Sequence, residues 1–207
     1  MNNAARIRWI AKPIVHFACL GPFAWLVWLV FAGGLGANPA DYMNRFLGDW
    51  ALRFLLIALA VTPIRGLTGW GIVMVFRRII GLYAFFYVSL HLTSYIVVDQ
   101  TLDWPAIWAD IVKRQYITVG MITFALLLPL AITSTNGMVR RLGAKRWRKL
   151  HRAVYVAGVG GVFHFFMMTK ADYREPTIYA ATLAFLLGYR IYVARKRRKP
   201  KKASATP

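Results

Sequence analysis

The sequence predicts an all-α membrane protein, a bundle of six transmembrane helices with both termini in the cytoplasm. Of its 207 residues, 58% are hydrophobic and 16% are charged, with a mean hydropathy of +0.48, which is too apolar for a soluble domain of this size. Apolar windows long enough to cross a hydrocarbon core about 30 Å thick recur along the chain. The basic residues gather between these windows, so the formal charge of +20 indicates membrane topology and argues against nucleic-acid binding.

Six windows meet the length expected of a membrane span. The first follows Arg6, Arg8 and Lys12 and is longer than the apolar segment of a typical signal peptide, so we expect an uncleaved span. The connections are a Gly/Pro turn at 33–39 and loops that are too short to form a second domain. We therefore expect one domain over 1–207 and find no evident internal repeat. The windows are 14–32, 47–64, 79–98, 117–133, 154–168 and 178–194, and the loops are 65–78, 99–114, 136–152 and 170–176.

The charges fix the expected orientation. With six spans, one side holds the N-terminus, the segments 65–78 and 140–152, and the tail from Arg190. These carry 21 basic residues, in groups of three, three, seven and eight, and no acidic ones. Because cytoplasmic loops are enriched in Lys and Arg, this side is predicted to be cytoplasmic. The basic cytoplasmic tail, 195–207, is expected to lie against anionic membrane lipid.

Two histidines are expected at one depth in the membrane. His91 lies 13 residues after Arg78, and His164 lies 13 residues after His151. On helices that run in the same direction, each interval spans about 20 Å, which places both side chains toward the external face. Facing neutral imidazoles are suitable axial ligands for a haem iron, and the apolar surroundings suit the haem macrocycle.

A second site is expected near the cytoplasmic face. His151 is a candidate metal ligand there, and Arg77, 14 residues before His91, lies on the same helix face as His91 at the level of His151. Arg77 would pair with a haem propionate or, more speculatively, act as an unusual ligand. On an ideal helix, His151 and His164 lie about 140° apart. Either two haems occupy different sides, or glycines between the histidines change the helix pitch.

Other interpretations remain open. Any one intramembrane histidine can simply form a hydrogen bond, and for His16 this is favoured over a quinone-binding or haem-adjacent role. Cys19 is the only cysteine, so the chain can build neither a disulfide nor a thiolate metal cluster by itself. Rival functions are a small transporter with a histidine proton relay and a stand-alone ferric or quinone reductase. The acidic residues of the external loops are candidates for partner docking, although solvated loop charge explains each: Asp99, Asp103, Asp110, Asp172 and Glu175.

Four segments carry a resemblance to a known family. They are GGLGANP at 33–39, HLTSY at 91–95, TST at 133–135 and LGAKRWRKLH at 142–151. Together they resemble the bacterial haem-binding membrane subunit of the periplasmic protein-methionine-sulfoxide reductase, within the ferric-reductase-like transmembrane superfamily. The likeness covers nearly the whole chain.

This resemblance implies that His91, His151 and His164 carry haem b, with one or two haems per chain. Relatives among the oxidases have a histidine where this sequence has Arg77. The implied role is electron transfer at the bacterial inner membrane, from the quinone pool or a cytosolic flavin reductase to a periplasmic molybdenum enzyme. That partner, and not this chain, reduces methionine sulfoxide in oxidised periplasmic proteins. FMN is also associated with the family, but the sequence shows no flavin site.

Overall fold

The chain is helical over the part described by the computed structural model, which covers residues 5 and 7–198, without the side chains of Arg8, Arg197 and Arg198. No strand occurs in these ranges. The short 3₁₀ and π segments are labelled η. In order, the elements are η1 (Ile7–Ala11), α2 (Lys12–Phe31), α3 (Pro39–Thr68), η2 (Gly71–Val75), α4 (Arg77–Ser94), η3 (Tyr95–Asp99), α5 (Trp104–Lys113), α6 (Gln115–Ile132), α7 (Asn136–Leu142), α8 (Ala144–Leu150), α9 (Ala153–Met168) and α10 (Arg174–Arg198).

Five helical stretches are long and apolar enough to cross a membrane. They begin at Trp9, Pro39, Arg77, Gln115 and Arg174 and range from 18 to 30 residues. The predicted window 154–168 forms α9, which has 16 residues. It is therefore shorter than the 18 residues taken as the minimum for a candidate membrane span. The predicted all-helical class is therefore confirmed for the residues described. Among them, five helices are candidate membrane spans by length and composition.

The loops predicted at 99–114 and 136–152 are largely helical, which corrects the expectation of irregular connections. Asp103 caps α5, because its side chain accepts a hydrogen bond from the Ala106 amide at 3.1 Å. Thr135 caps α7 in the same way, through the Met138 amide. These helices were missed because the span criterion detects length and overall hydropathy, whereas α5 is short and amphipathic.

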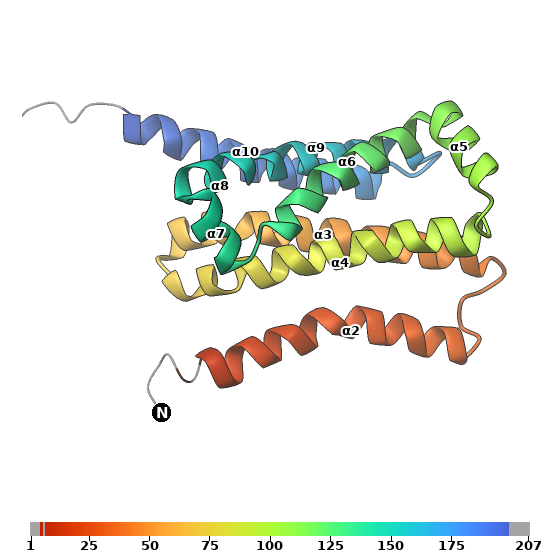
Figure 1. The fold of residues 1–207 in the computed structure, drawn as a ribbon, viewed down its shortest axis with the longest axis horizontal. Helices are drawn as coiled ribbons and strands as arrows, with labels where there is room; N and C mark the ends of the chain where they lie inside the picture. Colours follow the sequence, from red (N-terminus) through yellow and green to blue (C-terminus); the bar gives the residue numbers. More distant parts are fainter. Residues whose placement is uncertain (1–4, 6, 199–207) are drawn as a thin grey trace, which may run out of the picture.

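The helices form two packed pairs that position the site. Figure 1 shows α3 and α4 side by side, with α6, α9 and α10 above them in this view and α2 on the opposite side. The closest packing is within the pairs α3/α4 and α6/α9. Helix α5 lies at one end of the bundle, whereas α7, α8, the start of α2 and the end of α10 lie at the other. We call these the α5 end and the α7/α8 end.

Helix α10 is tied to the bundle through an arginine. Arg190 donates hydrogen bonds to the Leu59 carbonyl of α3 and to the Tyr155 hydroxyl of α9, the latter at 3.4 Å. The helix continues through Arg195 to Arg198, so the first part of the predicted tail is helical. Its remainder, 199–207, lies outside the described residues.

Helix α2 is held by a tyrosine inserted into its hydrogen-bond ladder. Tyr87 of α4 is fully buried, and its hydroxyl accepts a bond from the Phe23 amide at 2.9 Å. The same hydroxyl donates to the Cys19 carbonyl at 2.8 Å. The amide and carbonyl that would normally bond to each other in α2 are therefore bridged by a side chain from another helix, next to Pro22.

Removing this hydroxyl should loosen α2. We expect Tyr87→Phe to lower the stability of the protein in detergent by about 1–3 kcal/mol, since a buried amide and carbonyl lose their shared partner. Thermal unfolding measures the change. Tyr42→Phe, at an exposed position of α3, is the matched control. Equal melting curves for the two variants would contradict the bridging role.

Candidate functional site

Two histidines from different helix pairs meet in the interior of the bundle. His91 lies on α4 and His164 on α9, and their ring centroids are 6.1 Å apart with planes at 80°. Metal–imidazole bonds are about 2 Å long. A metal ion bound between two imidazoles would therefore separate their centroids by roughly 6 Å. The observed spacing suits one iron between the two rings.

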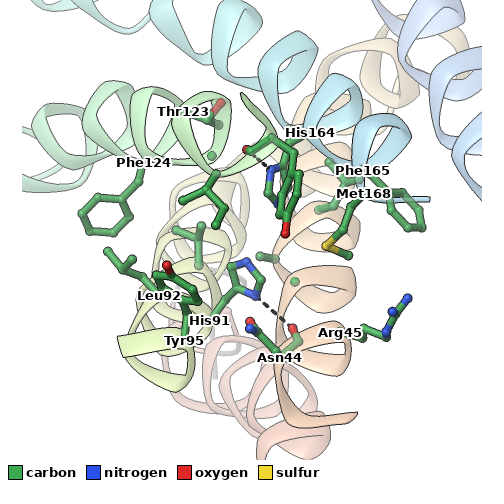
Figure 2. A pocket seen from close by; sticks show the side chains of 18 of the residues that line it. Asn44, Arg45, His91, Leu92, Tyr95, Thr123, Phe124, His164, Phe165 and Met168 are labelled. Atoms are coloured by element: carbon green, nitrogen blue, oxygen red, sulfur yellow. Dashed lines mark hydrogen bonds between the residues drawn. The ribbon is translucent and has the colours of Figure 1, made fainter. Parts of the chain in front are cut away.

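Each imidazole is oriented by a backbone carbonyl of the helix beside it. Nδ1 of His91 lies 2.9 Å from the Asn44 carbonyl of α3, and Nδ1 of His164 lies 2.7 Å from the Tyr116 carbonyl of α6. Figure 2 shows both contacts as dashed lines. A carbonyl oxygen can only accept, so Nδ1 carries the proton in both rings. Nε2 therefore keeps its lone pair for a metal.

A glycine one helical turn after each carbonyl makes room for the ring. A Cβ atom built at Gly48 would lie 3.2 Å from the His91 ring, and one at Gly120 would lie 3.1 Å from the His164 ring. Both distances are tighter than almost all real Cβ contacts. These two glycines thus allow the neighbouring backbone to approach the imidazoles closely.

The two halves of the site repeat one arrangement. In each, a helix supplies a carbonyl and, four residues later, a glycine, and a histidine follows 43 or 44 residues after that glycine on the partner helix. The expectation of no internal repeat therefore fails at the level of the site. The repeat is carried by backbone groups and single glycines, which leave little trace in side-chain sequence.

The histidines border a cavity of about 430 Å³ between α3, α4, α6 and α9. This volume lies within the range of small-molecule and cofactor sites. The middle of the cavity is apolar, and its α5 end carries charged and phenolic groups. The apolar lining includes Leu52, Leu55, Ala84, Val88, Phe124 and Leu127, and the polar end includes Arg45, Tyr95, Arg114, Tyr116 and Lys170.

These features fit an iron porphyrin. Over 5 and 7–198, no three His, Cys, Asp or Glu side chains gather as ligands for a bare metal ion. A porphyrin supplies four nitrogens itself and needs only axial ligands from the protein. Two imidazoles with free Nε2 atoms and an apolar slot match its iron and macrocycle. The cations Arg45 and Lys170 at one end suit its propionates, although Arg45 is paired with Asp41 and the lining also holds Asp49 and Asp99.

His151 does not join this pair. It lies in the turn between α8 and α9, where its ring stacks on Trp147 at a centroid distance of 3.9 Å. Its Nε2 is 3.1 Å from the Thr133 hydroxyl, which itself donates to the Pro129 carbonyl at 2.6 Å. Nε2 of His151 must therefore be the donor in this contact, the opposite tautomer to His91 and His164. Burial, together with the charges of Arg77 and Arg78, lowers the pKa of His151 and favours its neutral form.

The remaining predicted residues take separate positions. Arg77 is the first residue of α4, and its charge acts on His151, so these two share the α7/α8 end. Helix α9 is an unbroken α-helix, so no change of pitch at its glycines brings His151 and His164 onto one face. His16 of α2 forms a hydrogen bond of 3.0 Å with the Tyr83 hydroxyl of α4, well apart from the cavity lining.

Several known proteins are similar to this chain in sequence. The family described as ferric reductase like transmembrane component matches residues 47–162. His91 lies inside this range, and His164 lies two positions beyond it. The fold and this match define a membrane protein of the ferric-reductase-like class. Because five apolar helices accompany the match, the chain is a multi-pass membrane protein.

Individual relatives narrow the class. Three are each named protein-methionine-sulfoxide reductase heme-binding subunit MsrQ. The one from Rhodospirillum rubrum is 56% identical over 94% of this chain and 93% of its own length. Those from Caulobacter vibrioides and Xanthomonas euvesicatoria are each 48% identical, over 88% and 95% of this chain and 87% and 93% of their own lengths. The chain belongs to the MsrQ family.

Proposed function

We propose that this chain binds haem b between His91 and His164 and passes electrons through the membrane to a protein-methionine-sulfoxide reductase. The observation that carries the proposal is the pair of facing imidazoles, each with Nδ1 bound to a carbonyl and Nε2 directed to the shared cavity. The relatives are named haem-binding subunits of that reductase, which supports the same function.

The orientation follows from charge and arrangement. We propose that α9 is a sixth span in the bacterial inner membrane and that both termini are cytoplasmic. Support comes from the start of α2 and the end of α10, which share one end with the basic helices α7 and α8. The α5 end would then face the periplasm, and the His91–His164 pair would lie in the outer half of the membrane.

The protein contributes binding, orientation and exclusion of water. The carbonyls of Asn44 and Tyr116 fix the imidazole tautomers and raise the basicity of the ligating nitrogens. Lys170, at the α5 end of the cavity, and Arg45, which is paired with Asp41 there, would neutralise propionates. When bound, haem supplies one-electron chemistry by cycling between ferric and ferrous iron.

Donor and acceptor lie outside this chain. We propose that electrons come from the quinone pool or a cytosolic flavin reductase and leave for a periplasmic molybdenum enzyme, where methionine sulfoxide is reduced. A second haem at the α7/α8 end would use His151, with Arg77 nearby. Ligation through Nε2 would require His151 to give up its contact with Thr133.

Optical spectroscopy on the purified chain tests the proposal. A reduced-minus-oxidised spectrum should show the Soret and α bands of low-spin haem b, and a pyridine haemochrome assay should give at least one haem per chain. Reduced protein should then be reoxidised quickly by a periplasmic methionine-sulfoxide reductase and slowly by free ferric iron. If the protein is colourless after production with ample porphyrin, the proposal is wrong and the alternative function as a transporter is favoured.

His151→Ala separates the two ends of the bundle. We expect it to leave the spectrum of the His91–His164 haem unchanged, because the His151 side chain is bound to Thr133 and Trp147 and does not line the cavity. Haem content and the difference spectrum measure the outcome. Complete loss of haem from this variant, with the protein still folded, would contradict the pairing of His91 with His164.

A further inference from the structure

A chain of four side chains spans the cavity at its α5 end. The Tyr95 hydroxyl donates to Asp110 Oδ2 at 3.2 Å, and Arg114 Nε lies 3.1 Å from Asp110 Oδ1. Arg114 in turn donates to the Tyr116 hydroxyl at 3.3 Å. We call Tyr95, Asp110, Arg114 and Tyr116 the tyrosine clamp. It joins the end of α4, helix α5 and the start of α6.

Both ends of the clamp touch the histidine site. Tyr95 follows His91 by four residues, one helical turn further toward the α5 end. Tyr116 supplies the carbonyl that holds His164, and its ring centroid is 6.2 Å from the His164 ring. Tyr95, Arg114 and Tyr116 all line the cavity. The clamp therefore connects the surroundings of one imidazole to those of the other.

Asp110 at the centre of the clamp is not the solvated loop charge expected from the sequence. Its side chain is only 16% exposed, and each of its carboxylate oxygens bonds to a different element. The same helix buries Ile107 against the bundle and leaves Trp104, Trp108 and Val112 exposed. Asp110 thus ties α5 to Tyr95 and Arg114, two residues of the cavity lining.

We infer that the tyrosine clamp is a positioning device that holds Tyr95, Arg114 and Tyr116 across the α5 end of the cavity and limits the access of water there, thereby raising the reduction potential of the bound haem. This inference rests on the proposed function. The ferric form carries one more positive charge than the ferrous form, and water stabilises it preferentially. Excluding water from the α5 end of the cavity therefore shifts the balance toward the reduced state.

The double variant Tyr95→Phe/Tyr116→Phe tests the inference because it removes two hydroxyls and changes neither charge nor ring size. We expect the midpoint potential to fall, with about a tenfold lower ratio of reduced to oxidised haem at fixed ambient potential, or about 59 mV for one electron. The low-spin g values in electron paramagnetic resonance should shift as well. Tyr42→Phe, at an exposed position of α3, is the control and should leave both quantities unchanged.

Hydrogen exchange supplies a second measurement that needs no haem. Amides of α5 should exchange faster in the double variant than in the control, in protein prepared with or without porphyrin. If the α5 amides of the double variant exchange at the rate of the control, the clamp does not hold α5. If they exchange faster but the midpoint potential and g values stay unchanged, the clamp does not act on the haem. Absence of bis-histidine haem from the unaltered protein contradicts the proposed function instead, and exchange in α5 then decides whether the clamp exists.

Discussion

His91→Ala and His164→Ala are each expected to abolish the same haem signal, with at least a tenfold loss of haem per chain. In the proposed site each imidazole would supply one of two bonds to the iron, and the slot around them offers hydrophobic contact but no third histidine. A single remaining ligand would leave the iron high-spin or the porphyrin unbound. Haem content and the low-spin bands of the difference spectrum measure this loss.

The matched control is His16→Ala. His16 also lies on a long apolar helix and also forms a hydrogen bond to a neighbouring helix, through the Tyr83 hydroxyl of α4, but it does not line the cavity. We expect it to retain full haem. If His91→Ala and His16→Ala kept equal low-spin haem, the iron would have to be bound elsewhere in the chain.

Gly48→Leu and Gly120→Leu are expected to lower haem content several-fold while the helices remain intact. Even a Cβ at these positions crowds the histidine rings, and a leucine would push the imidazole out of line with its carbonyl. Because leucine is a better helix former than glycine, a weakened helix would not explain the loss of haem.

Gly81→Leu provides the comparison for these variants. Gly81 lies on the same helix as His91, and a Cβ there meets nothing within 4 Å. It should bind haem like the unaltered protein. Haem content and circular dichroism on the three variants separate a crowded imidazole from a misfolded chain, and normal haem in Gly120→Leu would show that the close approach is dispensable.

Residue counting predicted the depth of the histidines because the rise of an α-helix is nearly constant. It put His91 and His164 at one level, and the structure places their rings 6.1 Å apart. The groups that orient the rings could not be predicted in the same way, since every residue has a carbonyl. The four-residue spacing of Asn44 to Gly48 and of Tyr116 to Gly120 is visible in the sequence. Glycine is too common in membrane helices, however, for this spacing alone to indicate a histidine site.

Other features escaped the sequence for different physical reasons. Helix α5 is short, so a hydropathy window long enough for a span averages it away, although its Asp103 cap and Pro105 were readable signals. His151 was assigned from its depth and from the family resemblance, as if it lay on a continuous helix. It lies in a turn, where its contacts with Trp147 and Thr133 depend on the path of α8 and not on helical periodicity.

The repeated arrangement of carbonyl, glycine and histidine has a consequence for how the two helix pairs are joined. Because each imidazole is oriented within its own pair, α3/α4 or α6/α9, each pair presents one half of the proposed haem site. A haem iron bound to both Nε2 atoms would therefore cross-link the two pairs through the interior of the bundle.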